Sequence, residues 1–301
     1  MKKNRLGASG IEVSEIGLGC MSLGTEEGQA VSLIHEALDR GVTLLDTADL
    51  YDSGRNEELV GRAIQGRRNQ VILATKVGNR RIPGQEGWVW DPSGAYIRKA
   101  VRDSLRRLGT DYIDVYQLHG GTMDDPIEDT IEAFEELKRD GLIREYAISS
   151  LRPNVIREYA ARSGIVSVMN PYSIVDRRAE EEVLPLLQQR GIRVIGRGPL
   201  HSGALAARRE PLKGVPDYEL DELKTLRTVL EEKFAASGRN LTQVALRYPL
   251  GHPAVAAIVP GASSREQLLQ NLSAADCPPL SEEELAFIRS VSKANRYRQH
   301  R

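Results

Sequence analysis

Short apolar runs rich in β-branched residues recur along this chain of 301 residues, and most are followed by a segment with the apolar spacing of a helix. Continuous apolar strands that alternate with helices are typical of a parallel sheet buried on both faces. The candidate strands are the runs 13–19, 42–46, 70–76, 112–119, 143–149, 165–170, 192–197 and 254–261. Because no linker rich in proline, glycine or serine divides them, they predict one α/β domain over residues 1–301, a (β/α)8 TIM barrel.

The alternative architecture is a doubly wound parallel sheet. That fold would be favoured by a G-x-G-x-x-G turn after the first strand, with an acidic residue further along the chain. The segment GLGCMSLG, residues 17–24, contains glycines but not this spacing. The barrel is therefore the preferred prediction.

Two segments fall outside the alternation of strands and helices. Residues 5–13 are predicted to form a small β-hairpin that closes the bottom, or N-terminal end, of the barrel. Residues 79–93 form a long predicted loop that contains both tryptophans, Trp88 and Trp90. Long loops in compact domains are usually functional or disordered. The two tryptophans either form a lid or substrate wall, or simply pack the loop.

Boundary signals mark several of the predicted helices. One helix is predicted to have Asp125 as its N-cap and Pro126 at its first position. The segment 91–109 follows the same pattern of aspartate and proline. Ser281 and Glu284 have the spacing of a capping box, in which each side chain satisfies a backbone N–H of the other residue.

The composition of the chain limits the classes of molecule that it is expected to bind. Lysine and arginine number 41 against 42 aspartates and glutamates, without a long block of like charge, so neither nucleic acid nor a membrane surface is indicated. Cys20 and Cys277 match no metal or redox spacing, so we expect no metal centre and a reducing, cytoplasmic location. We expect no signal peptide, because the basic first residues lead to no apolar segment, and no apolar run approaches the roughly 20 residues of a membrane helix. The basic segment 293–301 is expected to be a frayed tail, and a monomer is favoured over an oligomer.

Polar residues stand at the ends of most of the candidate strands. They are Asp46, Lys76, His119, Ser149, Asn170 and Arg197, and Gly261 closes the eighth strand. In a parallel barrel all strands point the same way, so these residues converge on the rim where barrel enzymes keep their chemistry. One polar residue at a strand end means little, but six in register predict a functional site.

Tyr51, in a polar turn five residues after Asp46, suggests the chemistry of this site. A phenol has an ordinary pKa near 10 and donates its proton poorly at neutral pH, but a nearby ammonium lowers that pKa. Lys76 is predicted to do this, with Asp46 keeping Lys76 charged, so that Tyr51 becomes a general acid. His119 would bind the oxygen that receives the proton. This set suits hydride addition to an aldehyde or ketone, with the hydride coming from a cofactor.

Seven segments together resemble the aldo-keto reductase family, from about residue 4 to residue 275: GLGCMSLG, LLDTADLYDSGRNEELVG, ILATKVG, DYIDVYQLHG, YAISS, GRGPLHSGAL and IVPGASSREQLLQNLSAA. The resemblance is strongest to a bacillar cytoplasmic subgroup. It implies a (β/α)8 barrel that binds NADP(H) without a Rossmann fold and reduces carbonyl compounds. It also implies that Asp46, Tyr51, Lys76 and His119 form the catalytic tetrad. In this tetrad the tyrosine is the proton donor, the lysine–aspartate pair tunes it, and the histidine orients the carbonyl.

The same resemblance implies the contacts of the cofactor and substrate. The nicotinamide end would lie against Cys20, Met21, Asp46, Ser149, Ser150 and Arg197. The pyrophosphate would lie against Gly198, Pro199 and Leu200, with Arg208 as a cationic contact. The adenosine and its 2′-phosphate would lie against Gly261, Ser263, Gln267, Gln270 and Asn271, in a turn that opens a helix close to Arg265. The substrate would contact Tyr51 and His119, and the position of Trp88 in the long loop, rather than the resemblance, adds this tryptophan as an expected substrate contact.

The chain departs from the family pattern at four positions. The family usually has asparagine or arginine at Ser150, glutamine at Met169 and an aromatic ring at Arg197. A planar guanidinium can also stack on a ring, although the interaction is a different one. Gly121 replaces a proline two residues after the histidine. These changes affect the predicted nicotinamide contacts and the preference for NADPH over NADH.

Two other functions are alternatives to carbonyl reduction for a barrel of this kind. Some barrels that resemble this family are channel subunits that bind a nicotinamide nucleotide and turn it over slowly, but such subunits can lack the residue that stands here as His119. A barrel aldolase would instead use Lys76 as a Schiff base. Asp46, which is predicted to keep that lysine charged, argues against it.

Overall fold

Eight parallel strands form one sheet in the computed structural model, which describes residues 1–82, 84, 86–207 and 214–301. In sheet order the strands are β3 (Leu18–Gly19), β4 (Leu44–Asp46), β5 (Ile72–Val77), β8 (Ile113–Leu118), β9 (Ile143–Ser149), β10 (Ser167–Pro171), β11 (Arg193–Arg197) and β12 (Val255–Val259). Parallel bridges from Ile16 to Ile258 and from Gly19 to Gly261 join the two ends of the sheet. The predicted (β/α)8 barrel is therefore confirmed, and the doubly wound alternative is wrong because the sheet closes on itself.

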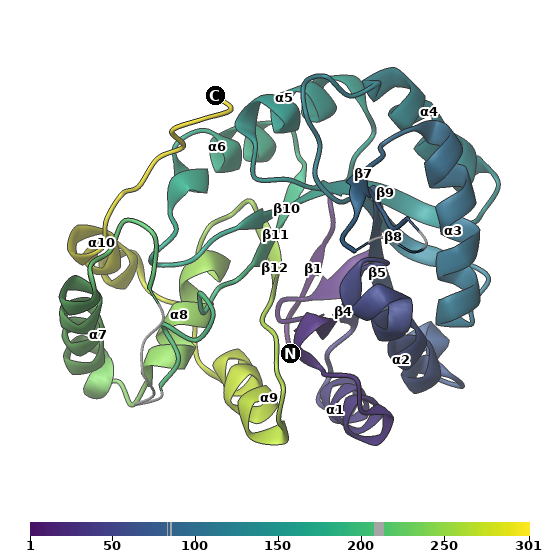
Figure 1. The fold of residues 1–301 in the computed structure, drawn as a ribbon. Coiled ribbons are helices and arrows are strands. Elements are labelled where there is room, and N and C mark those ends of the chain that lie inside the picture. The colour runs from purple at the N-terminus through teal and green to yellow at the C-terminus, as the bar shows by residue number, and fades with distance from the viewer. Residues whose placement is uncertain (83, 85, 208–213) are drawn as a thin grey trace.

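Helices surround the strands on the outside of the barrel (Figure 1). They are α1 (Glu27–Asp39), α2 (Arg55–Ile64), α3 (Gly94–Leu108), α4 (Ile127–Arg139), α5 (Pro153–Arg162), α6 (Val183–Gln189), α7 (Leu220–Ala235), α8 (Leu241–Leu250), α9 (Arg265–Leu272) and α10 (Glu282–Val291). Each buries an apolar face, as α4 does with Ile131, Phe134 and Leu137 at helical spacing. None of the helices in the described ranges combines the length and apolar character needed to cross a bilayer.

A β-hairpin closes the bottom of the barrel, as predicted. Strands β1 (Lys3–Arg5) and β2 (Glu12–Ser14) pair antiparallel, and Leu6 and Val13 are buried among the inward side chains of the barrel strands. The predicted strand 13–19 is wrong as a single element, because it divides between β2 and β3. Ser14 and Thr43 exchange two hydrogen bonds of 2.9 and 3.0 Å at this point, and these bonds hold the corner between hairpin and barrel.

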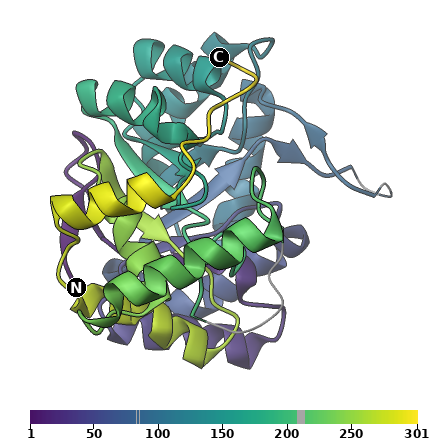
Figure 2. The same cartoon turned by 90° about the vertical axis from the view of Figure 1, so that its left-hand side faces the viewer.

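The segment 79–93 is a short β-arm rather than a loop without secondary structure. Strands β6 (Asn79–Arg80) and β7 (Val89–Trp90) pair antiparallel, and the arm projects away from the barrel (Figure 2). Trp90 anchors the base of the arm, since its ring packs closely on Gly78 and Gly120 and its Nε1 donates to Asp125 at 2.9 Å. Trp90 therefore packs the arm, and it also lines the cavity over the barrel rim.

Two of the predicted helix caps are wrong. Asp125 does not cap α4; its carboxylate accepts hydrogen bonds from the backbone N–H and hydroxyl of Thr122 instead. Ser93, not Asp91, caps α3 by accepting from the N–H of Tyr96 at 3.3 Å. In both places a neighbouring hydroxyl donates to the aspartate, whose carboxylate is thereby engaged in the loop before the helix.

The capping box of Ser281 and Glu284 at the start of α10 is confirmed. The prediction of a frayed tail over 293–301 is wrong, because Tyr297 is only 5% exposed and the segment bonds back to the barrel at several points. The segment contains one aromatic residue, Tyr297, between two arginines, and its ring provides the apolar area that is buried.

Gly61 lies where α2 packs against the end of α3, and a substitution at this position tests how closely the two helices pack. A Cβ at this position would lie 2.6 Å from the carbonyl oxygen of Leu108 and 2.8 Å from that of Arg107, both backbone atoms that cannot rotate away. We expect Gly61→Ala to lower the free energy of unfolding by roughly 1–3 kcal/mol, although alanine is the better helix former. Gly28→Ala, on the exposed side of α1, is the control and should be neutral or slightly stabilising. A melting temperature of Gly61→Ala at or above that of the wild type would contradict the close approach.

Candidate active site

Four predicted site residues meet at the C-terminal rim of the barrel. Asp46 ends β4, Lys76 lies in β5, and His119 follows β8 directly. Tyr51 begins a 3₁₀ turn, Tyr51–Gly54, that follows β4. The Lys76 Nζ lies 2.7 Å from Asp46 Oδ2 and 3.4 Å from the Tyr51 hydroxyl, and the rings of Tyr51 and His119 meet edge to face with centroids 6.1 Å apart.

Lys76 uses all three of its ammonium hydrogens. They are donated to Asp46 Oδ2 at 2.7 Å, to the carbonyl of Thr47 at 2.7 Å and to the Tyr51 hydroxyl at 3.4 Å. The side chain is 1% exposed, and burial alone would lower its pKa. The charge of Asp46, together with Tyr51 and the hydrogen bonds to both residues, outweighs that effect and raises the pKa of Lys76 above its ordinary value. Lys76 is therefore a fixed, charged ammonium.

Asp46 is held from its other side by Gln117. The Gln117 amide donates to Asp46 Oδ1 at 3.2 Å, while Lys76 occupies Oδ2. Burial raises the pKa of Asp46, and Lys76 and Gln117 act in the opposite direction. Gln117 was not predicted from the sequence, although a glutamine near the end of the largely apolar strand 113–118 was a visible signal.

The pKa of Tyr51 does not follow the prediction. Burial raises the pKa of the phenol, and the opposing charge of Lys76 does not reverse the shift. The expectation of a depressed pKa is therefore wrong, because desolvation of a phenolate costs more than the 3.4 Å contact with the ammonium returns. Tyr51 stays protonated at neutral pH, and Lys76 can stabilise the phenolate only once the proton has left.

His119 is a neutral imidazole. Burial, assisted by the charges of Lys76 and Arg197, lowers its pKa to about 3. Its Nδ1 is buried without a hydrogen-bond partner among the described residues, while its backbone N–H donates to the carbonyl of Val77 at 2.7 Å. A neutral imidazole offers one N–H donor, which is suited to orienting an oxygen atom.

Helix α2 forms hydrogen bonds to the strands that carry the site, on the outer face of the barrel. The hydroxyl of Thr47 donates to Asn56 at 2.7 Å, and that of Thr75 donates to Glu57 at 2.6 Å. Asn56 also donates to the carbonyl of Cys20 at 2.9 Å. Both Asn56 and Glu57 are fully buried, and the sequence analysis missed them because polar residues in the first turn of a helix usually face solvent.

A cavity of about 1190 Å³ lies over the rim and is lined by all four tetrad residues. Most of the residues predicted to bind a cofactor also line it: Met21, Ser149, Ser150, Arg197, Gly198, Pro199, Leu200, Gly261, Ser263, Gln267, Gln270 and Asn271. Cys20 does not line the cavity, because its thiol is buried and donates to the carbonyl of Leu18. Arg208 lies outside the described residues.

Arg197 and Arg265 differ in their availability to a ligand. Arg265 pairs with Glu36 at 3.2 Å and therefore does not present a free cation to the nearby turn. Arg197, at the end of β11, is exposed to solvent and forms no ion pair within the described ranges, and partial desolvation of its guanidinium lowers the pKa of this group. Met169 lines the cavity beside Ser149 and Ser150 and offers no amide there.

A family model described as the aldo/keto reductase family matches residues 15–293. The chain belongs to the aldo/keto reductase family. It is 53% identical over 308 residues to the protein of Bacillus subtilis (strain 168) named uncharacterized oxidoreductase YqkF, with both chains covered completely. This similarity supports assignment of the present aldo/keto reductase as an oxidoreductase.

Solved structures of other aldo/keto reductases share the fold over nearly the whole chain. The holo form of aldo-keto reductase AKR11C1 from Bacillus halodurans is 55% identical, with a TM-score of 0.96 and coverage of 100% of this chain and 99% of that one. The apo form of the same protein gives a TM-score of 0.86 at the same coverage. An aldo/keto reductase from Klebsiella pneumoniae, solved in complex with NADP and acetate, is 30% identical with a TM-score of 0.81 and covers 99% of each chain.

Asp49 is a half-buried carboxyl that lies beside the tetrad without belonging to it. Its Oδ1 has no hydrogen-bond partner in the part of the chain that the structure describes. Burial, together with the charge of Glu57, raises its pKa from 3.8 to about 7, against the opposing charges of Arg107 and Lys76. The folded state therefore binds more protons than the unfolded chain between these two values, and stability falls as the pH rises through this window.

Asp49→Asn replaces this carboxyl with an uncharged group of the same shape. We expect the variant to exceed the wild type in free energy of unfolding by roughly 2–4 kcal/mol at pH 8, because each unit of pKa shift is worth about 1.4 kcal/mol. The advantage should shrink as the pH falls through the window below about 7. Urea unfolding at several pH values measures it, with Asp52→Asn, an exposed aspartate of the next turn, as the control. A gain independent of pH would contradict the assignment.

Proposed function

We propose that this aldo/keto reductase reduces aldehydes and ketones to alcohols with NADPH, and that Tyr51 donates the proton. The observation that carries the proposal is the arrangement around Lys76 Nζ, which lies 2.7 Å from Asp46 and 3.4 Å from the Tyr51 hydroxyl in the wall of a large cavity. A charged ammonium beside a protonated phenol suits a reaction that leaves a phenolate behind.

The residues along the cavity fit NADP(H). Backbone N–H groups at the start of a helix favour phosphate, and the turn from Gly261 to Ser264 opens α9 in this way. Asn271 braces the turn by donating to the carbonyl of Gly261 at 3.0 Å. We assign the phosphate end to Gly261, Ser263, Gln267, Gln270 and Asn271, and the carboxamide end to Ser149 and Ser150. The Klebsiella relative solved with NADP supports the same cofactor.

The guanidinium of Arg197, which has no ion-pair partner among the residues that the structure describes, lines the same cavity as the tetrad. We propose that it stacks on the nicotinamide ring, where the family resemblance implies an aromatic side chain. A guanidinium is planar and weakly hydrated, which suits it to stacking.

Each tetrad residue then has a separate task. NADPH, when bound, supplies the hydride that the carbonyl carbon accepts. His119 donates its N–H to the carbonyl oxygen and orients it, and Tyr51 donates its proton to the same oxygen as negative charge develops there. Lys76 stabilises the phenolate that remains, and Asp46 keeps Lys76 in place.

An aldolase mechanism fits this geometry less well. A Schiff base needs a neutral lysine with a free electron pair, whereas the pKa of Lys76 is raised and its hydrogens are donated to three oxygen atoms. The presence of His119 in the cavity favours an enzyme that converts a substrate, rather than a module that only binds the nucleotide.

Tyr51→Phe tests the proton donor. We expect the rate of NADPH oxidation with an aldehyde to fall by about 10²–10⁴-fold, the usual contribution of a general acid, while NADPH binding is retained. Tyr96→Phe, a half-buried tyrosine of α3 that does not line the cavity, should keep its activity. Equal turnover by Tyr51→Phe and wild type, or tight NADPH binding by the wild type with no turnover of any carbonyl, would contradict the proposal.

The mouth of the cavity favours a large carbonyl compound of low charge. Met21, Trp88 and Leu151 line the cavity and are 63%, 52% and 42% exposed. Large apolar side chains that stay exposed at a cavity usually meet an apolar ligand. We therefore propose a substrate whose apolar part lies against these side chains.

Trp88→Ala tests this substrate class. We expect kcat/KM for decanal to fall by about tenfold, since an indole buries a large apolar area against a ligand, while kcat/KM for propanal stays unchanged. Val89→Ala is the matched control, because Val89 is 37% exposed on the same arm but does not line the cavity. Equal losses for the long and the short aldehyde would show that Trp88 does not contact the apolar part.

A further inference from the structure

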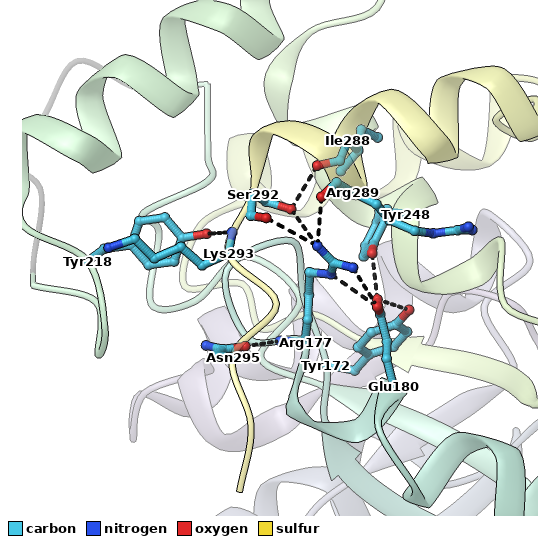
Figure 3. Close-up of polar contacts among 10 residues, drawn as sticks. All are labelled: Tyr172, Arg177, Glu180, Tyr218, Tyr248, Ile288, Arg289, Ser292, Lys293 and Asn295. Carbon is cyan, nitrogen blue, oxygen red and sulfur yellow. Dashed lines mark hydrogen bonds and ion pairs between the residues drawn. The ribbon is translucent and has the colours of Figure 1, made fainter.

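The chain beyond α10 returns to the barrel and runs along its outside towards α5 and α6 (Figures 1 and 2). Arg177, after β10, holds the start of this C-terminal segment, residues 292–301. Its guanidinium donates to the carbonyl of Arg289 at 3.0 Å and to the carbonyl and hydroxyl of Ser292, each at 3.2 Å (Figure 3). The backbone N–H of Arg177 donates to Asn295 at 2.7 Å. The segment is thus attached to one buried arginine.

Arg177 is itself held rigidly. Glu180 accepts from its guanidinium at 2.8 Å and from the hydroxyl of Tyr172 at 2.9 Å (Figure 3). The hydroxyl of Tyr248 donates to the same carboxylate. A charged, hydrogen-bonded cluster of this kind costs much to disrupt, so it provides a firm base for the segment.

Tyr297 anchors the far part of the segment. It is 5% exposed, whereas its neighbours Arg296 and Arg298 are exposed. The guanidinium of Arg178 lies 5.2 Å from the centre of its ring, and its hydroxyl donates to Asn170 Oδ1 at 3.3 Å. A frayed surface tail would leave such an aromatic ring exposed to solvent.

Asn170 connects this anchor to the wall of the cavity. It is completely buried at the end of β10, and its Nδ2 donates to the carbonyl of Ser150 at 2.8 Å. The N–H of Ser150 in turn donates to the carbonyl of Met169 at 3.1 Å. The hydroxyl of Tyr297 is therefore one residue, Asn170, away from the backbone of a cavity-lining serine.

We propose that the C-terminal segment positions the carboxamide end of the cofactor cavity, with Tyr297 as the positioning residue acting through Asn170 on Ser150. The inference rests on the proposed function, which assigns this end of the cavity to the nicotinamide. Because Met169 supplies no amide here, Ser149 and Ser150 carry the polar contacts of this wall, and their orientation matters more. The hydrogen bond from Tyr297 fixes the rotation of the Asn170 amide and hence the carbonyl of Ser150.

Tyr297→Phe removes this hydrogen bond and keeps the ring. We expect the Kd for NADPH to rise by about three- to tenfold, the range of one buried hydrogen bond. The Kd for adenosine 2′,5′-bisphosphate, which has no nicotinamide, should stay unchanged. A purely structural loss would weaken both ligands alike. Tyr297→Ala, which also removes the ring, should give a larger effect of the same selectivity.

Tyr218→Phe is the matched control, because the Tyr218 hydroxyl accepts from the N–H of Lys293 at 2.6 Å and so contacts the same segment at a residue other than Tyr297 (Figure 3). It should bind both ligands as the wild type does. Unchanged NADPH affinity in Tyr297→Phe, equal weakening of both ligands, or the same loss in Tyr218→Phe would overturn the inference. Failure of the wild type itself to bind NADPH would instead overturn the proposed function, so the two failures are distinguishable.

Discussion

The buried ion pair between Lys76 and Asp46 is the interaction on which the rest of the site depends. Its two side chains are 1% and 6% exposed and lie 2.7 Å apart. Taking two charges out of water is costly, and a buried pair contributes little net stability unless every remaining donor and acceptor is satisfied. Here Thr47, Tyr51 and Gln117 complete the set. The pair is better understood as a fixed source of charge beside a phenol than as a stabiliser of the fold.

The alternation of side chains along the strands explains how the barrel builds this pair. Asp46 and Lys76 point inward from neighbouring strands, so Thr47, which directly follows β4, and Thr75, which precedes Lys76 on β5, point outward. Those outward threonines bond to Asn56 and Glu57 of α2. Helix α2 therefore fixes how far each of the two strands extends relative to the other. Hydrogen bonds on the outer face of the sheet thus bring Asp46 and Lys76 into contact on its inner face.

The arrangement of charge in the cavity suits the anion that the proposed reaction would form. His119 is neutral because it is buried beside Lys76 and Arg197, and burial keeps Tyr51 protonated. Lys76 is committed to its partners, whereas Arg197 has no carboxylate partner among the described residues. Negative charge that develops on a carbonyl oxygen would thus meet two neutral donors, with a cation directly behind one of them. The C-terminal segment adds a second layer of support, since Tyr297 and Asn170 join it to the far wall of the same cavity.

The sequence by itself determined the barrel, its closing hairpin and the placement of Asp46, Lys76 and His119, because strand periodicity and a shared strand direction are local properties that add up to one rim. It did not determine which hydroxyl caps α3, how the arm of Trp90 folds, or that Tyr297 is buried, because each depends on a contact with a distant segment. It also predicted the wrong direction for the pKa of Tyr51, since spacing reveals which charge is nearby but not how completely water is excluded. Burial and long-range hydrogen bonds exist only once the chain has closed, and they decided the chemistry of the residues that the pattern had located.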